Sequence, residues 1–256
     1  MYTSRRRSLF DPQSTIPFRL SRSKIELYTK CPRCFYLDRR MGVSQPPGFP
    51  FNLNSAVDHL LKKEFDIHRA KNRAHPLMDA YGLDAVPFSH QKLDEWRDPF
   101  KGITHHHIPS NFIVTGGVDD IWINPAGELI IVDYKATSKD SEITIDAEWQ
   151  NSYKRQMEIY QWLFAKNDFK VSRTGYFVYC NGKRDREAFD AKLEFDIKLI
   201  PYQGDDSWIA PALNEIRKYL MQSTPPLSSA QCEYCEYVEA VQQVAPHTPA
   251  LKKTLF

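Results

Sequence analysis

The sequence contains no long hydrophobic run. No apolar segment among its 256 residues approaches the roughly 18 residues that a membrane-spanning helix needs. The basic start MYTSRRRSLF is not followed by the apolar core of a signal peptide. No internal repeat, long low-complexity tract or G-x-x-x-x-G-K-[ST] motif occurs, and the missing motif argues against a fused ATP-driven motor. We therefore expect a cytoplasmic protein without a membrane partner.

Cysteine is scarce, and its spacing is informative. Four of the five cysteines form two C-x-x-C pairs, Cys31 with Cys34 and Cys232 with Cys235. So few thiols argue against a secreted disulfide framework, and the paired spacing favours a bound metal or cluster. Four thiolates suit either tetrahedral Zn²⁺ or a 4Fe-4S cluster, and four reduced cysteines without a metal are the alternative. Cys180 ends a predicted strand and is interpreted as a small core residue.

Composition and charge predict one globular domain with a basic start. Hydrophobic residues make up 42% and charged residues 26% of the chain, which is typical of a soluble protein with a single core. Residues 1–75 contain 15 Lys and Arg but 6 Asp and Glu, whereas residues 76–256 contain 19 and 26. The basic part suggests an acidic partner such as nucleic acid, or else a solvated arm. We expect a flexible arm in residues 1–20 and one domain in residues 21–256, with a variable insertion at about 71–110 and a C-terminal cysteine knuckle.

Periodicity and turn signals predict an alternation of helices and strands. Helices are expected at residues 24–40, 56–70, 152–167 and 206–222. Strands are expected at residues 116–124, 128–136, 173–182 and 191–201, the first two joined as a hairpin. Pro32 marks a kink or boundary within the first helical segment. The order helix, strands, helix, strands, helix predicts an α/β fold.

The segment GELIIVDYKAT, residues 127–137, places ionisable groups at the end of an apolar strand. Side chains alternate between the two faces of a strand, so Asp133 and Lys135 point to the same face as Ile131. Charged groups are costly to bury there unless they are paired or bind a metal. They therefore either reach solvent at the strand end or take part in chemistry.

Asp119 is expected to meet these groups from the preceding strand, whereas Asp120 points to the other face with Trp122. Two carboxylates beside a lysine can hold Mg²⁺ or Mn²⁺. The lysine can orient an attacking water or stabilise charge that develops on a phosphate. Phosphodiester hydrolysis fits this set, although a D-x-K spacing alone is also common at structural strand ends.

Several motifs together resemble the PD-(D/E)XK nuclease superfamily, specifically its RecB-like branch, which includes the AddB-type and CRISPR-associated adaptation nucleases. The resemblance covers most of the chain, and the segment LSRSKIELYTKCPRCFYL looks like the opening helix of that branch. The residues that match the family pattern, in chain order, are His59 in AVDHLL, Asp119 in GGVD, Asp133 and Lys135 in IVDYK, and Gln156 and Tyr160 in QMEIY.

The resemblance implies a restriction-endonuclease-like α/β core, a mixed sheet flanked by helices, and an Mg²⁺- or Mn²⁺-dependent deoxyribonuclease. Lys135 would position the attacking water, and Gln156 and Tyr160 would lie beside the metal and the substrate phosphate. Asp58 or Glu64 could replace the histidine of the family's ligand set. That set would be His59, Asp119, Asp133 and the backbone carbonyl of Tyr134.

In iron-sulfur members of the family, one N-terminal cysteine and three C-terminal cysteines hold a 4Fe-4S cluster that joins the chain ends. Here Val241 occupies the place of the fourth cysteine, and Cys34 could supply the missing thiolate. The resemblance further implies single- or double-stranded DNA as substrate and a helicase or another repair or defence protein as partner. The alternative is a non-catalytic nucleic-acid-binding or assembly protein that keeps the fold.

Overall fold

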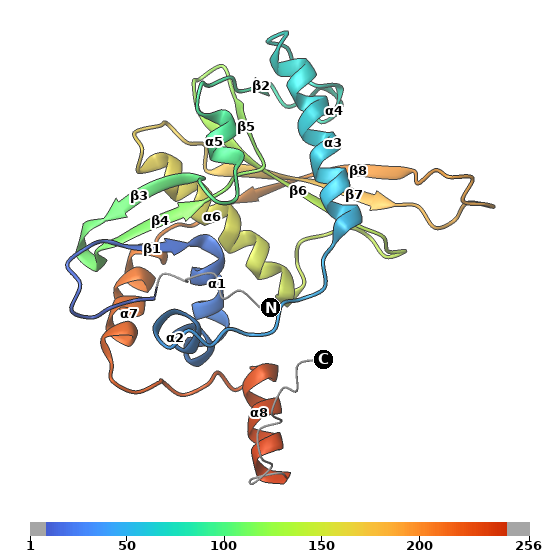
Figure 1. Ribbon diagram of the computed structural model, residues 1–256. Helices are drawn as coiled ribbons and strands as arrows, with labels where there is room; N and C mark the ends of the chain where they lie inside the picture. Colours follow the sequence, from blue (N-terminus) through green and yellow to red (C-terminus); the bar gives the residue numbers. More distant parts are fainter. Residues whose placement is uncertain (1–8, 245–256) are drawn as a thin grey trace, which may run out of the picture.

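Residues 9–244, which are the residues that the computed structural model describes, form two mixed β-sheets flanked by helices (Figure 1). One sheet has the strand order β1-β4-β3 and the other the order β2-β5-β6-β7-β8. The strands are β1 (Phe18–Ser21), β2 (Val86–Pro87), β3 (Ile103–His107), β4 (Phe112–Gly116), β5 (Asp120–Ile123), β6 (Leu129–Thr137), β7 (Thr174–Gly182) and β8 (Phe195–Gln203). The α-helices are α1 (Arg22–Lys30), α2 (Pro32–Arg40), α3 (Asn52–Arg69), α4 (Pro76–Ala80), α5 (Leu93–Arg97), α6 (Asn151–Ala165), α7 (Ile209–Met221) and α8 (Glu233–Val244).

Both sheets combine parallel and antiparallel pairs. β1 runs parallel to β4, and β3 runs antiparallel to it. In the larger sheet β6 and β7 are parallel, whereas the other neighbouring strands are antiparallel. The predicted α/β class with a mixed sheet and flanking helices is confirmed.

Strand β6 is buried on both faces because a helix covers each side of the larger sheet. Ile131 belongs to the same core as Ile159 and Leu163 of α6. Val132 belongs to a second core together with Phe65 of α3. A strand buried on both faces is expected to be almost entirely apolar, so the charged residues at the end of β6 stand out.

The first predicted helix is divided in two. α1 ends at Lys30, Cys31 is extended with φ −158° and ψ 107°, and α2 begins at Pro32. Proline is tolerated at a first helical position because its missing N–H would have no intrahelical partner there. Pro32 is therefore a helix start, as its position predicted.

The structure corrects the expected N-terminal arm. Residues 1–8 lie outside the described part, but the segment that follows them is folded. Phe10 is buried in the main core, and β1 pairs in register with β4 from Phe18 to Ser21. The arm therefore does not extend to residue 20.

The expected insertion at about residues 71–110 contains short elements, but they belong to the core sheets. β2 pairs with β5 at the edge of the larger sheet, and β3 pairs with β4 in the smaller one. The C-terminal knuckle also continues into a helix, α8, which stands apart from the sheets beside α2 (Figure 1). Among residues 9–244, no helix is both long enough and apolar enough to cross a membrane.

Candidate active site and cysteine cluster

The hairpin of β5 and β6 brings the predicted acids and lysine together. Asp120 is the register partner of Val132. Asp119 therefore lies opposite Asp133 at the open end of the hairpin, away from the turn. The amide of Tyr134 donates a hydrogen bond to Asp119 Oδ2 at 3.0 Å. The backbone of β6 therefore holds Asp119 where the two strands separate.

Asp133 is fully buried, with 0% of its surface exposed, and lies against the ammonium group of Lys135. The ammonium group of Lys135 is the ion-pair partner of Asp133 Oδ2, whereas Oδ1 has no hydrogen-bond partner among the described residues. Burial raises the pKa of Asp133 to about 7, while Lys135 opposes the shift and Asp119 adds to it. A buried carboxylate oxygen without a partner is costly unless a further donor or cation completes its environment, so the free Oδ1 of this acid fits a metal site.

The ammonium group of Lys135 is held between these acids and an aromatic ring. Burial lowers its pKa, but Asp133 and Asp119 raise it, and the net direction is upward. Its Nζ also lies 4.6 Å from the centre of the Tyr153 ring. Lys135 is therefore a hydrogen-bond donor and a fixed positive charge rather than a base.

Helix α3 adds Asp58 and Lys62 to the site. Lys62 Nζ lies 2.8 Å from Asp58 Oδ2 and 3.5 Å from Asp119 Oδ1. Burial raises the pKa of Asp58, and the charge of Asp119 raises it further, whereas Lys62 and Lys135 oppose the shift. Asp58 and Lys62 are four residues apart, as are Leu61 and Phe65 on the buried side of the same helix. Residues at this spacing share a helix face, so the sequence itself indicates that Asp58 and Lys62 lie side by side.

The structure does not bring His59 to the acids, which corrects its predicted role as a metal ligand. His59 is exposed, because each helical residue is rotated by about 100° from the one before and Asp58 already faces the site. Glu64 does not take this place either, since its Oε1 lies 3.0 Å from His75 Nε2. Of the three candidate ligands Asp58, His59 and Glu64, only Asp58 faces Asp119.

Gln156 and Tyr160 pair on helix α6, next to the acids. Gln156 Nε2 donates a hydrogen bond to the Tyr160 hydroxyl at 3.2 Å. Burial raises the pKa of Tyr160, the charge of Arg22 opposes this shift, and Asp119 and Asp133 add to it. A Cβ atom added to Gly116 would lie 2.5 Å from the Tyr160 ring, so the glycine allows the ring to approach β4. Arg22, at the start of α1, is a nearby positive charge that the motifs did not identify.

Asp120 has a structural environment on the opposite face of the sheet. Its Oδ1 lies 2.5 Å from Arg69 Nη2 and 2.8 Å from Arg97 Nη2. The hydroxyl of Tyr134 donates a hydrogen bond to Asp120 Oδ2 at 2.7 Å. These contacts join β5, β6, α3 and α5, so consecutive aspartates have different surroundings: Asp119 faces the site and Asp120 ties it to the scaffold.

The four cysteines of the C-x-x-C pairs form one buried cluster that joins the N- and C-terminal segments. Their sulfur atoms all lie within 4.8 Å of one another. The Sγ–Sγ distances are 3.8 Å for Cys31–Cys235, 3.5 Å for Cys34–Cys232 and 3.6 Å for Cys34–Cys235. All are free thiols, and a salt bridge at 3.0 Å between Arg33 and Glu239 also joins α2 to α8.

Each C-x-x-C pair lies at the start of a helix. Cys31 and Cys232 immediately precede α2 and α8, and Cys34 and Cys235 are in the first turns. Helix N-termini favour negative charge. Burial raises the pKa of the Cys31 thiol, but backbone hydrogen bonds from Cys34 and Ser229 lower it to a net value of about 7. Four convergent thiols at two helix starts fit a thiolate-bound metal or cluster.

The mixed sheet and the site of two acids and a lysine define an α/β protein with a candidate divalent-metal site. The chain belongs to the PD-(D/E)XK nuclease superfamily, whose sequence profile matches residues 53–240.

No curated protein matches the sequence. Among solved structures, the crystal structure of SSO0001 is 23% identical to this chain, covers 50% of each of the two chains and has a TM-score of 0.29. The chain spans about half the length of that protein, and at this TM-score the likeness carries no argument.

Proposed function

We propose that the protein is a metal-dependent deoxyribonuclease of the RecB-like branch that hydrolyses phosphodiester bonds. The observation that carries this proposal is the unpartnered Oδ1 of fully buried Asp133, whose Oδ2 is paired with Lys135 and which lies beside Asp119. Hard carboxylate oxygens are the ligands that Mg²⁺ and Mn²⁺ prefer. The ligands are Asp119, Asp133, the carbonyl of Tyr134 and, in place of His59, Asp58.

When bound, the metal ion supplies Lewis acidity at the phosphate and a more acidic bound water. Protonated Lys135 donates hydrogen bonds that orient the attacking water and offset the charge developing on phosphate oxygens. Tyr153 limits the positions of the lysine from the side. Gln156 and Tyr160 hold the neighbouring wall of the site through their mutual hydrogen bond.

For the cysteine cluster, we propose a single tetrahedral Zn²⁺. Zinc–sulfur bonds of about 2.3 Å give a tetrahedron with sulfur–sulfur edges of about 3.8 Å. Three of the six sulfur–sulfur distances, 3.5 to 3.8 Å, are close to this value, and none of the six exceeds 4.8 Å. A 4Fe-4S cubane would place irons and sulfides between the thiolates and therefore hold their sulfur atoms much farther apart. The spacing favours zinc, although the family resemblance pointed to iron.

The test of the proposed function is a cleavage assay with end-labelled single- and double-stranded DNA, with Mg²⁺, with Mn²⁺ and with a chelator. Cleavage that needs the divalent ion supports the proposal. If no DNA is cut with either ion, the proposal is wrong and the non-catalytic nucleic-acid-binding alternative replaces it. Because removal of zinc could unfold the protein, metal content and melting temperature are measured in the same samples.

A further inference from the structure

A groove of about 650 Å³ opens beside the candidate active site. Its walls come from the start of α3, the end of β6, the segment from Trp149 to Tyr153, and the residues that enter β8. Asp58 and Lys135 line the groove and also belong to the acidic site. The groove is therefore continuous with the place where a phosphate would be cut.

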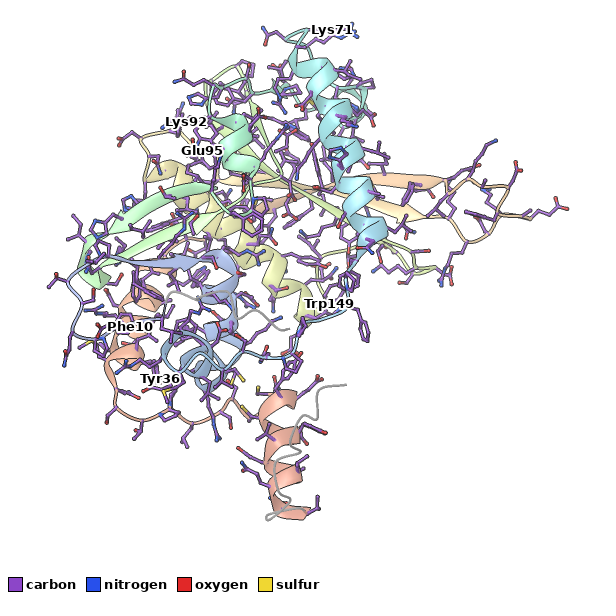
Figure 2. All side chains as sticks on the ribbon, in the orientation of Figure 1. Phe10, Tyr36, Lys71, Lys92, Glu95 and Trp149 are labelled. Carbon is purple, nitrogen blue, oxygen red and sulfur yellow. The ribbon has the colours of Figure 1, made fainter. Side chains whose placement is uncertain are left out.

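Two aromatic side chains lie in the exposed part of this groove. Phe51 is 74% exposed and Trp149 is 60% exposed. In Figure 2, Trp149 lies beside the start of α3, at the opposite end of that helix from Lys71. The Tyr153 and Trp149 rings are nearly perpendicular, with a centroid distance of 5.4 Å and an interplanar angle of 81°, so the tyrosine can cover at most one face of the indole.

Trp149 is distinctive among the tryptophans. The chain has five, and all lie in the described residues. Trp96, Trp122 and Trp162 are buried, and Trp208 is half-buried with its Nε1 donating a hydrogen bond to Glu158. Only Trp149 is exposed, so an exposed indole is not a general feature of this surface.

The groove has little positive charge for gripping a duplex. Lys135 is the only lysine or arginine among its lining residues. Proteins grip duplex DNA mainly through lysine and arginine contacts to the phosphates of both strands. Single-strand binders also contact phosphates with basic residues, but they add aromatic side chains on which unpaired bases stack. The bases of an intact duplex are already stacked on one another and cannot use such a surface.

We infer that this groove binds an unpaired base of single-stranded DNA, with Trp149 and Phe51 as the stacking surface. The inference rests on the proposed nuclease function of the adjacent site. A strand whose phosphate lies at Lys135 places the neighbouring base in the groove, where the aromatic rings receive it. The site therefore selects single strands or unpaired strand ends over intact duplex.

The experiment measures the tryptophan fluorescence of the full chain during titration with a phosphorothioate strand of about twelve nucleotides, a length within the site sizes of single-strand binders. Phosphorothioate linkages resist cleavage, so binding is measured without turnover. A blunt-ended duplex of the same sequence, with a G·C base pair at each end, is titrated for comparison. We expect saturable quenching by the single strand and none by the duplex.

Three variants identify the source of the signal. Trp149→Ala is expected to weaken single-strand affinity about tenfold, the effect of losing roughly one stacked base. Trp149→Phe is expected to keep the affinity within about threefold, since phenylalanine still stacks, but to lose the quenching. Phe100→Ala, which removes an aromatic side chain that is 80% exposed and does not line the groove, is expected to change neither.

Equal quenching by the duplex, or unchanged affinity in Trp149→Ala, would overturn the inference. Cleavage separates this result from the proposed function. A parent protein that cuts duplex and single strand equally, with Trp149→Ala as active as the parent, contradicts base binding but leaves the nuclease intact. A parent that cuts no DNA, yet whose Trp149 responds only to single strands, contradicts the nuclease but supports base binding.

Discussion

The amide of Tyr134 donates a hydrogen bond to the carboxylate of Asp119 at 3.0 Å, which ties the end of β5 to β6 where their acids meet. This contact fixes Asp119 beside Asp133, the neighbour of Tyr134 in the chain. This hydrogen bond from a backbone amide to a side chain therefore positions the two carboxylates of the candidate metal site relative to each other, before any ion binds.

The first prediction distinguishes two adjacent residues of α3. Asp58→Asn is expected to raise the Mn²⁺ concentration for half-maximal cleavage about tenfold or more, because it removes an anionic ligand, an effect of the size seen on losing groups that support a metal. His59→Ala is expected to leave that concentration unchanged, since His59 is exposed. A Mn²⁺ titration of the cleavage rate measures both. The reverse result would return the ligand role to His59.

The second prediction concerns pH. Burial raises the pKa of Asp133 from 3.8 to about 7 in the metal-free protein. Between these values the folded state retains a proton that the unfolded state has lost, so this group lowers the stability of the metal-free protein as pH rises through that window. Metal binding must displace the proton. Mn²⁺ affinity is therefore expected to rise with pH up to about 7 and then to level off.

Calorimetry of Mn²⁺ binding in buffers with different ionisation enthalpies measures the proton release. Proton release from the Asp133 carboxyl is expected near pH 6 and is expected to be absent near pH 8. Asp133→Asn serves as the control and should bind Mn²⁺ more weakly without that release. Equal proton release by the parent at both pH values would show that the Asp133 carboxyl is not the group displaced.

The third prediction tests the ion cluster around Asp120. Asp120→Ala would remove the buried carboxylate shared by Arg69 and Arg97, which keep only the half-buried Asp66. Removing one member of a buried charge pair costs about 3 to 5 kcal/mol, and the remaining contact places the expected cost at the lower end of that range. The free energy of unfolding from urea denaturation is expected to fall by about that amount. Asp84→Ala, at an exposed aspartate, is the control. A parent-like midpoint for Asp120→Ala would show that the cluster contributes little to stability.

The fourth prediction concerns the cysteine cluster. One site built from both C-x-x-C pairs joins segments about 200 residues apart. Loss of its metal would therefore remove a link that closes a loop of about that length. Cys232→Ser is expected to lose zinc and to melt at a lower temperature, while its effect on cleavage follows only from that instability. Cys180→Ala should keep the zinc, because Cys180 lies in another core.

Metal analysis and absorbance identify the bound group. Colourless protein with one zinc per chain agrees with the sulfur–sulfur spacing, whereas iron with absorbance near 400 nm would show a cluster and contradict it. A metal-free parent whose Cys232→Ser variant melts at the parent temperature would exclude both groups.

The sequence predicted the centre of the site because its geometry is local. Alternation along β6 and the short hairpin to β5 place Asp119, Asp133 and Lys135 together without knowledge of the rest of the fold. The rotation of α3 was harder to predict, because neighbouring leucines give no single apolar face: Leu61 is buried, whereas Leu60 is 62% exposed. A helix face is set by the sheet it covers, and for this reason Asp58 rather than His59 reaches the acids.

Long-range pairing was the other feature that local patterns did not show. β1 and β4 are about 90 residues apart and pair in parallel, and short strands such as β1 and β2 carry little period-2 signal. The sequence-based expectation therefore assigned β1 to a flexible arm and β2 and β3 to an insertion. The two C-x-x-C pairs together with the family resemblance, in contrast, predicted that the N- and C-terminal segments meet, and the four-cysteine cluster confirms this.

The most direct test of the central claim is DNA cleavage by Lys135→Ala compared with the parent and with Lys63→Ala, whose lysine is exposed on α3. Mg²⁺ or Mn²⁺ should support cleavage by the parent and by Lys63→Ala. Lys135→Ala, folded and with its zinc retained, should be slower by on the order of a hundredfold or more, the loss expected when a positioned catalytic group is removed. Cleavage by Lys135→Ala at the parent rate would contradict the assignment of this site as the active site of a nuclease.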